Sequence, residues 1–385
     1  MDFSAVDQEI IAGVEREVFP GAVVLVNQAG SVVYRRAFGW RSVEPERKPL
    51  HETTIFDLAS LTKPLATTTA IMLMVKEKIL RLDDRVTRFF PNFGIQGKTH
   101  LTFRHLLSHS SGLPAWRPYY REIAARETQE GKIGFLGTRS AREFVYTQLQ
   151  REKLEAEPGQ RTVYSDLGFI LLGATIEELS GVGLEQYCHE KIFRPLGLGS
   201  LSFINLEALR RRRIQLTEDN YASTEHCPWR KRVLCAEVHD DNAYAMGGVA
   251  GHAGLFAAID DVDKLVSVLV ACYRGEHAFI PQHVMQTFWT RADIVPGSTW
   301  CLGWDSPSPY NSSAGEYFSS HSVGHLGFTG TSLWVDLDRH LHVIVLSNRV
   351  HPHRSNDAIQ AFRPALHNAV MRVILEAGKG IKDKG

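Results

Sequence analysis

The sequence predicts an α+β fold in which both ends of the chain build one antiparallel sheet and a helical lobe is inserted between them. Residues 21–40 and 332–350 are β-rich, whereas residues from about 85 to 240 carry mainly helical patterns. We expect one catalytic unit over 1–385, flanked by terminal helices. Its sheet lobe covers about 1–60 and 240–385. Its helical lobe covers about 61–239. A cleft between two such lobes is a natural place for a site.

The predicted strands come in two pairs. Residues 21–30 and 31–40 are each rich in Val and aromatic residues and are joined by a turn at Ala29-Gly30. Residues 332–338 and 341–350 have the same character and are separated by a short polar turn. The two pairs lie far apart in the chain, so a shared sheet has to bring its ends together.

Apolar spacing predicts the helices. An amphipathic period runs from Phe3 to Val18, and a continuous apolar stretch from Thr62 to Ile79 indicates a buried helix. Four helices are expected in the middle of the chain and one at its end: Thr102–Ser108, Ala141–Gln150, Ser165–Leu179, Leu184–Phe193 and about 356–376.

Composition excludes several functions. The chain has 43 basic and 43 acidic residues and no long basic block, which argues against a nucleic-acid partner. No signal peptide opens the sequence, and no apolar stretch approaches the length of a membrane span. Five widely spaced cysteines without a C-x-x-C motif predict reduced thiols, so we expect a cytoplasmic protein.

Ser60 and Lys63 form an S-x-x-K motif, a spacing that could support nucleophilic catalysis. The ring of Pro64 would clash with the carbonyl four residues earlier, so Ser60 has to lie at the beginning of the helix. Free backbone N–H groups and the positive end of the helix dipole favour negative charge there. Lys63 shares a helix face with Ser60 and could activate it as a nucleophile. Alone, the motif fits an ordinary helix cap beside a surface lysine better than it fits a nucleophile.

Two further segments add to this motif. Tyr164 stands at the entry to the helix that Ser165 or Asp166 caps, where it could project into a cleft. His325 lies in a segment with glycine at every third position, Gly324 to Gly330, which permits close approach to a strand edge. Taken singly, each would be interpreted as a packing residue.

Together, S60-L-T-K63, Y164-S-D166 and H325-L-G327 resemble, in type and order, the three motifs of serine β-lactamases, penicillin-binding proteins and related esterases. Supporting segments are similar to class C β-lactamases and family VIII-type esterases. Residues 238–243, 247–256 and 347–352 resemble low-molecular-mass penicillin-binding proteins of the 4B type. The resemblance implies a β-lactamase/transpeptidase-like fold.

The resemblance also implies roles. Ser60 would attack a carbonyl and form an acyl-enzyme, and Lys63 and Tyr164 would share the general-base and general-acid work. His325 occupies the family's Lys or His position and would act electrostatically on Tyr164. The backbone N–H groups of Ser60 and Phe328 would form an oxyanion hole. No metal and no organic cofactor is expected, and the partner is a small-molecule acyl substrate.

Two positions depart from the family pattern. Asp166 replaces the usual Asn, and its carboxylate would raise the pKa of Lys63, which burial alone would lower. Proton abstraction would then fall to Tyr164, whose pKa we expect Lys63 and a protonated His325 to lower. Leu326 replaces the Thr or Ser whose hydroxyl helps lactam-binding relatives to hold a substrate carboxylate.

Other residues are candidates for lining the site. Asn348 and Arg349, at a strand end, could recognise a carboxylate or could simply face solvent. Gly327 would allow close approach to the backbone, and His252 lies in a segment that borders the cleft in the family, where it could equally be structural.

The sequence therefore predicts a serine acyl hydrolase acting through an acyl-enzyme on ester or amide substrates. A β-lactamase or a D-Ala-D-Ala carboxypeptidase is the alternative within the same chemistry. A penicillin-binding sensor or scaffold that acylates without turnover is a third function, which would not need Ser60, Lys63 and Tyr164 together.

Overall fold

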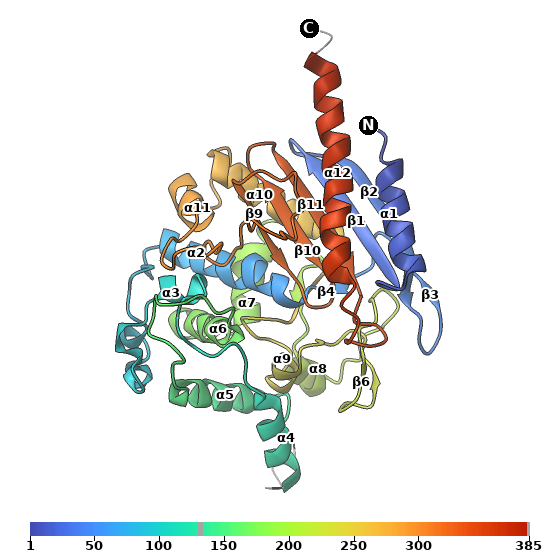
Figure 1. The fold of residues 1–385 in the computed structure, drawn as a ribbon. Helices are drawn as coiled ribbons and strands as arrows, with labels where there is room; N and C mark the ends of the chain where they lie inside the picture. Colours follow the sequence, from blue (N-terminus) through green and yellow to red (C-terminus); the bar gives the residue numbers. More distant parts are fainter. Residues whose placement is uncertain (130–133, 383–385) are drawn as a thin grey trace.

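A six-stranded antiparallel sheet forms the centre of the computed structural model, which describes residues 1–129 and 134–382 (Figure 1). Its strands come only from the two ends of the chain, as predicted. The strand order is β3-β2-β1-β11-β10-β9. Their bounds are β1 Gly21–Gln28, β2 Ser31–Ser42, β3 Lys48–Pro49, β9 Ser322–Leu326, β10 Ser332–Asp336 and β11 Leu341–Ser347.

The two chain ends meet where β1 pairs with β11, with Val24 opposite Val345. Alternate residues of β1 point to opposite faces of the sheet, as the two-residue period of a strand requires. Val23 and Leu25 enter the larger core, and Val24 enters the smaller one. Both faces are therefore apolar, which explains why this strand is buried along almost its whole length.

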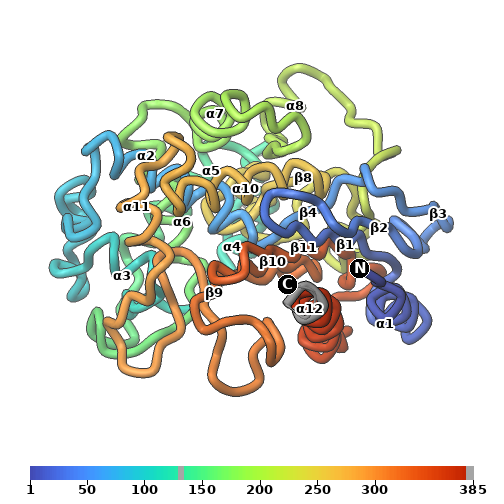
Figure 2. Tube along the Cα trace, turned by 90° about the horizontal axis from the view of Figure 1, so that it is seen from above, coloured from blue at the N-terminus to red at the C-terminus, as the bar shows by residue number. Residues whose placement is uncertain are grey.

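Helices cover both faces of the sheet. The terminal helices α1 (Ser4–Glu15) and α12 (Ile359–Lys382) pack together on one face and close the smaller core. Helix α10 (Ile259–Arg274) packs against β1 and β11 on the other face. Figure 2 shows the terminal pair on one side of the strands and α10 on the other.

The remaining elements lie largely in the middle of the chain. The other helices are α2 Thr69–Lys76, α3 Phe103–Leu107, α4 Tyr119–Gln129, α5 Arg139–Arg151, α6 Asp166–Ser180, α7 Leu184–Cys188, α8 Leu206–Arg212, α9 Asp241–Ala245 and α11 Gln282–Phe288. Two small sheets, ordered β4-β8-β5 and β6-β7, consist of β4 Phe56–Asp57, β5 Ser202–Phe203, β6 His226–Cys227, β7 Arg232–Val233 and β8 Leu255–Ala257. Figure 1 shows α4, α5 and α6 on the side of the sheet away from both termini.

The predicted α+β class, the four strands and the helices named from the sequence are confirmed, with shifted ends. The turn between β1 and β2 contains Ala29 at φ 52° and Gly30 at φ 81°, the left-handed pair that a tight hairpin needs. The strand β9, which carries His325, lies at one end of the sheet order. The boundaries of the two predicted lobes stay a prediction.

The helix after Ser60 differs from the regular one that we expected over Thr62–Ile79. It opens with a 3-10 turn, Ala59–Leu61, continues as a wide π-helical segment, Lys63–Thr68, and becomes regular only in α2. Pro64 has no N–H to donate, and it lies in the first turn of the wide segment, where a helix tolerates such a loss.

Within residues 1–129 and 134–382, no single helix is both long and apolar enough to cross a bilayer. One pair of segments, Asp166–Ser180 and Leu184–Phe193, reaches that length and composition jointly, with a bend of 75° between them.

Candidate active site

The turn that carries Ser60 is held from both sides. It follows β4, and Ala59 adopts a left-handed conformation at φ 47°, which is strained for a residue with a side chain. The buried carboxylate of Asp57 accepts the N–H of Ala59 at 2.8 Å and that of His239 at 2.6 Å. These bonds fix the turn that leads to the Ser60 hydroxyl.

Lys63 lies one turn after Ser60 and is fully buried. Its Nζ is 2.9 Å from Ser60 Oγ, 3.1 Å from the carbonyl oxygen of His252 and 2.7 Å from Asp166 Oδ1. Burial disfavours the ammonium, but the charge of Asp166 and its contact with the ammonium outweigh this effect and raise the pKa of Lys63. Lys63 is therefore protonated in the resting site.

Tyr164 projects from the segment before α6, against the same lysine. The Lys63 ammonium lies 4.9 Å from the centre of its ring. Ser165 anchors this segment, because its N–H donates to Nδ1 of His109 at 3.0 Å and its hydroxyl donates to the carbonyl of Pro114 at 2.6 Å. Burial raises the pKa of Tyr164 in spite of the opposing charge of Lys63. Our expectation of a lowered pKa is therefore wrong, because desolvation exceeds the attraction.

His325, on β9, lies 6.0 Å from Tyr164 between ring centres. Its Nδ1 is 2.9 Å from the carbonyl oxygen of Leu326, so Nδ1 carries the proton and Nε2 is left as an acceptor. Burial and the charge of Lys63 lower the pKa of His325 to about 3. His325 is neutral at physiological pH, and the expected imidazolium beside Tyr164 does not form there.

A short loop after β9 completes the arrangement. Its threonines bind the Ser60 turn: Thr329 Oγ1 donates to the carbonyl of Asp57 at 2.8 Å, and Thr331 Oγ1 donates to that of Leu58 at 3.1 Å. Phe328 is 48% exposed, and its N–H has no hydrogen-bond partner among the residues that the structure describes. The loop thus holds one free N–H group against the strand that leads to Ser60.

A cavity of about 670 Å³ opens over these groups, and Ser60 and Tyr164 line it. The β9 edge and the following loop contribute one wall: His325, Leu326, Gly327 and Phe328. The aromatic ring of Trp300 also lines the cavity, as do several residues with charged or amide side chains: Asp305, Asn311, Arg349, Asp357, Gln360 and Arg363. Ser313, Trp334 and Ile359 complete the lining. Lys63 lies behind this surface, buried under Ser60.

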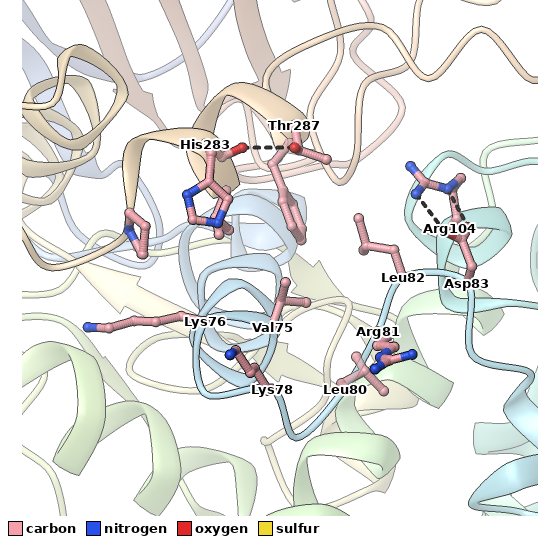
Figure 3. A pocket seen from close by; sticks show the side chains of 13 residues that line it. Val75, Lys76, Lys78, Leu80, Arg81, Leu82, Asp83, Arg104, His283 and Thr287 are labelled. Carbon is pink, nitrogen blue, oxygen red and sulfur yellow. Dashed lines mark hydrogen bonds and ion pairs between the residues drawn. The ribbon is translucent and has the colours of Figure 1, made fainter.

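A second cavity, of about 560 Å³, lies between the end of α2 and α11 (Figure 3). Its wall is basic, but Arg104 is paired with Asp83 at 2.7 Å and Lys76 donates to the carbonyl of Phe279. Neither Ser60 nor Tyr164 is among the residues that line it. The chemistry-bearing groups of the sequence motifs therefore lie at the first cavity.

Three other candidates occupy different positions. Arg349 lines the cavity, with its guanidinium 4.4 Å from the centre of the Phe328 ring. The Asn348 amide instead donates to the carbonyls of Arg41 and Ser223, at 3.1 Å each, so it supports the strand end away from the lining. His252 is buried and meets Lys63 through its carbonyl only.

One group of residues in the described part of the chain has the spacing of metal ligands. Atoms of Asp166, Asp240 and His252 lie within 4.8 Å of one another. Each already has a partner, because Asp166 faces Lys63, and His252 Nε2 is 3.0 Å from Asp240 Oδ1. A cation at this position would have to displace the Lys63 ammonium, so the donor set does not fit a resident metal.

Sequence reasoning missed Asp57, Trp300 and Arg363. Asp57 fixes the Ser60 turn, and the other two line the cavity. Asp57 has a local signal, since a carboxylate two residues before a strained position can accept its N–H. Arg363 lies in a segment whose pattern is typical of an amphipathic surface helix, so the sequence does not indicate a role at the site for this residue.

The fold and the site define an active-site-serine acyl hydrolase: a buried lysine contacts a serine at the start of a helix, beside a mainly antiparallel sheet. The sequence model of the β-lactamase family matches residues 6–365 of the chain, and the chain belongs to this family. The resemblance drawn from the three motifs is thereby confirmed.

The names of individual relatives describe several different activities. A putative D-alanyl-D-alanine carboxypeptidase of Escherichia coli K12 is 32% identical over 355 residues, which cover 86% of this chain and 79% of the relative. An N-acetylmuramyl-L-alanine amidase of Bacillus subtilis 168 is 30% identical over 90% of this chain and 80% of its own length. The solved structure of EstCE1, a hydrolase with promiscuous acyltransferase activity, superposes with a TM-score of 0.72. It is 24% identical and covers 96% of this chain and 98% of its own.

Replacing Gly327 with Ala should disturb the site without unfolding the protein. An added Cβ would lie 1.9 Å from Thr331 Oγ1 and 2.7 Å from the carbonyl oxygen of Leu58, so the loop would have to move. We expect a loss of about tenfold or more in kcat/KM, because small misplacements of catalytic groups are costly. Gly199→Ala, which meets nothing within 4 Å, is the control. Equal activity of both variants in an ester assay would show that the loop position does not matter.

Proposed function

We propose that Ser60 is the nucleophile of an acyl-enzyme mechanism on small ester or amide substrates. The observation that carries this proposal is the 2.9 Å contact between Lys63 Nζ and Ser60 Oγ beneath a cavity that can hold a small molecule. The N–H groups of Ser60 and Phe328 would receive the oxyanion. No metal or organic cofactor takes part in this scheme.

The protonation states of Lys63 and Tyr164 decide how Ser60 is activated. The Lys63 ammonium and the Tyr164 phenol both have a raised pKa, so the resting site holds one proton more than a base requires. Loss of this proton yields a neutral lysine or a phenolate, either of which can accept the Ser60 proton as the carbonyl is attacked. The same proton then passes to the leaving group, and water repeats the sequence to release the acyl group.

We propose an activated ester as the preferred substrate over a β-lactam. Leu326 gives the cavity an apolar wall where lactam-binding relatives present a hydroxyl. The two hydroxyls nearby, of Thr329 and Thr331, already donate to backbone carbonyls of the Ser60 turn. They are therefore not free to hold a substrate carboxylate.

A D-amino-acid carboxypeptidase is the second candidate. Arg349 supports it, because this guanidinium lines the cavity and makes no ion pair among the described residues, which would suit a terminal carboxylate. The name of the Escherichia coli relative points to the same chemistry. Asn348 no longer belongs to this candidate subsite, because its amide is engaged elsewhere.

We also propose that the protein acts in the cytoplasm on a small molecule rather than on a nucleic acid. All five cysteines are free thiols, which favours a reducing compartment. The balanced charge gives no attraction to a polyanion.

Ser60→Ala should abolish both ester hydrolysis and covalent labelling by a fluorophosphonate probe, because no other group replaces the nucleophile. Labelling is read by intact-protein mass spectrometry, and Ser308→Ala, a change in a loop away from the turn, serves as control. An adduct on another serine in Ser60→Ala would refute the assignment.

Short p-nitrophenyl esters should be turned over with a higher kcat/KM than nitrocefin, because the Leu326 wall lacks the hydroxyl that holds a lactam carboxylate. A D-Ala-D-Ala peptide assayed beside them tests the second candidate. A higher kcat/KM for nitrocefin would make the protein a β-lactamase, and a higher value for the peptide would make it a carboxypeptidase. Acylation by all three without turnover would indicate a sensor.

Asp166→Asn should move the acidic limb of the kcat/KM profile to lower pH. The wild-type rate should rise with pH, because the base form appears only as the raised pKa values of Lys63 and Tyr164 are approached. Removing the Asp166 charge lowers the pKa of Lys63, so the base form appears earlier. We expect Tyr164→Phe to cost at least about tenfold more activity, since general-base assistance contributes about 10²–10⁴ in rate.

The control for this experiment is Asp338→Asn, at an exposed turn, which should leave the profile unchanged. An unchanged profile in Asp166→Asn would show that this carboxylate does not govern the lysine. Near-normal activity in Tyr164→Phe would return the base role to Lys63.

A further inference from the structure

Arg363, on α12, is a buried cation without an anionic partner. It is 6% exposed, and it forms no ion pair with any carboxylate of the described residues. Its Nη2 donates instead to two backbone carbonyls, of Gly327 at 2.7 Å and of Thr331 at 2.8 Å. Its Nε is buried without a partner.

Such a placement is costly, because a buried charge loses hydration that neutral carbonyls replace only in part. Burial and the neighbouring charge of Arg349 lower the pKa of Arg363 to about 9, so the guanidinium is still cationic at neutral pH. A neutral or apolar side chain could fill the same space on α12. Only a donor such as arginine, however, can form hydrogen bonds to the two backbone carbonyls, of Gly327 and Thr331.

The carbonyl of Gly327 and the N–H of Phe328 belong to one peptide group. A charge-assisted hydrogen bond to that carbonyl withdraws electron density from the peptide and strengthens its N–H as a donor. It also helps to fix the peptide plane, because the N–H of Gly330 donates to the same carbonyl at 3.1 Å. The preceding peptide is held as well, since the N–H of Gly327 donates at 2.7 Å to the Thr331 carbonyl that Arg363 also binds. The free N–H of Phe328 is thus held at one end of a polarised unit whose other end faces a cation.

Arg349 binds the same loop but a different peptide. Its Nε donates to the carbonyl of Phe328 at 2.8 Å, which shares its peptide group with the N–H of Thr329. Arg349 therefore anchors the loop. Of the two arginines, only Arg363 contacts the peptide that carries the Phe328 N–H, and the carbonyl of that peptide also accepts the N–H of Gly330 at 3.1 Å.

We propose that Arg363 is a positioning residue for the oxyanion site, which orients and polarises the Gly327–Phe328 peptide through its carbonyl. The proposal rests on the oxyanion role assigned above to the Phe328 N–H. Arg363 acts through the peptide and makes no contact with the reacting atoms.

The test compares Arg363→Met, Arg363→Gln and Arg363→Lys with Arg372→Met, an exposed cation farther along the same helix. Three quantities are measured: kcat and KM for a p-nitrophenyl ester, inhibition by a trifluoromethyl ketone, and thermal unfolding. The ketone forms a hemiketal with Ser60 whose oxyanion needs the Phe328 N–H. The matching trifluoromethyl alcohol, which cannot add Ser60 and carries no charge, serves as a ligand without an oxyanion.

We expect Arg363→Met to lower kcat by about tenfold or more, somewhat less than the ~10²–10³ that follows removal of an oxyanion donor. Affinity for the ketone should fall in parallel, while KM and binding of the trifluoromethyl alcohol change less than about threefold. Arg363→Lys should recover part of the loss, because an ammonium can still donate to the Gly327 carbonyl. Arg372→Met should behave as the wild type.

Ketone affinity that is unchanged in Arg363→Met and in Arg363→Gln would overturn the proposal, as would equal losses for the ketone and the trifluoromethyl alcohol. If Arg363→Met does not fold, the comparison of Arg363→Gln with Arg363→Lys decides. If Ser60→Ala still hydrolyses the ester, the proposed function itself fails. If Ser60→Ala is inactive while all Arg363 variants equal the wild type, only the role of Arg363 fails.

Discussion

The buried ammonium of Lys63 is the interaction on which the rest of the site depends. A cation with no exposure has to be surrounded by oxygen atoms, and Lys63 finds them in Ser60, Asp166 and the carbonyl of His252. These three groups come from separate parts of the chain. The lysine thus joins the Ser60 turn, the start of α6 and the segment before β8 at one point.

Buried charges also hold the backbone around Ser60 in place. Asp57 is a buried carboxylate satisfied by two backbone N–H groups, and Arg363 is a buried guanidinium satisfied by two backbone carbonyls. Neither forms an ion pair among the described residues. Charged side chains here hold backbone in place, one for the strained turn at Ala59 and the other for the loop of Phe328. The rigidity of the site therefore comes from side chains that need not meet the substrate.

What could be predicted from the sequence depends on how local each feature is. The pair Ser60 and Lys63 follows from spacing within one turn, and the β1–β2 hairpin follows from two turn residues. The neutral state of His325 and the raised pKa of Tyr164 could not be predicted, because the depth of burial depends on elements distant in sequence. Asn348 was expected at the site because it ends a strand, but the direction of its side chain depends on Arg41 and Ser223. Helix α10 was missed although it covers the central strands.

The distribution of the site along the chain has a consequence for its synthesis. Ser60 and Lys63 leave the ribosome early, whereas the Phe328 loop, its partner Arg363 and the strands that pair with β1 are made among the last residues. An incomplete chain contains Ser60 and Lys63 but has neither the Phe328 loop nor the strands that pair with β1. With the roles proposed above, the growing chain cannot hydrolyse acyl donors until translation is almost complete and its two ends are joined.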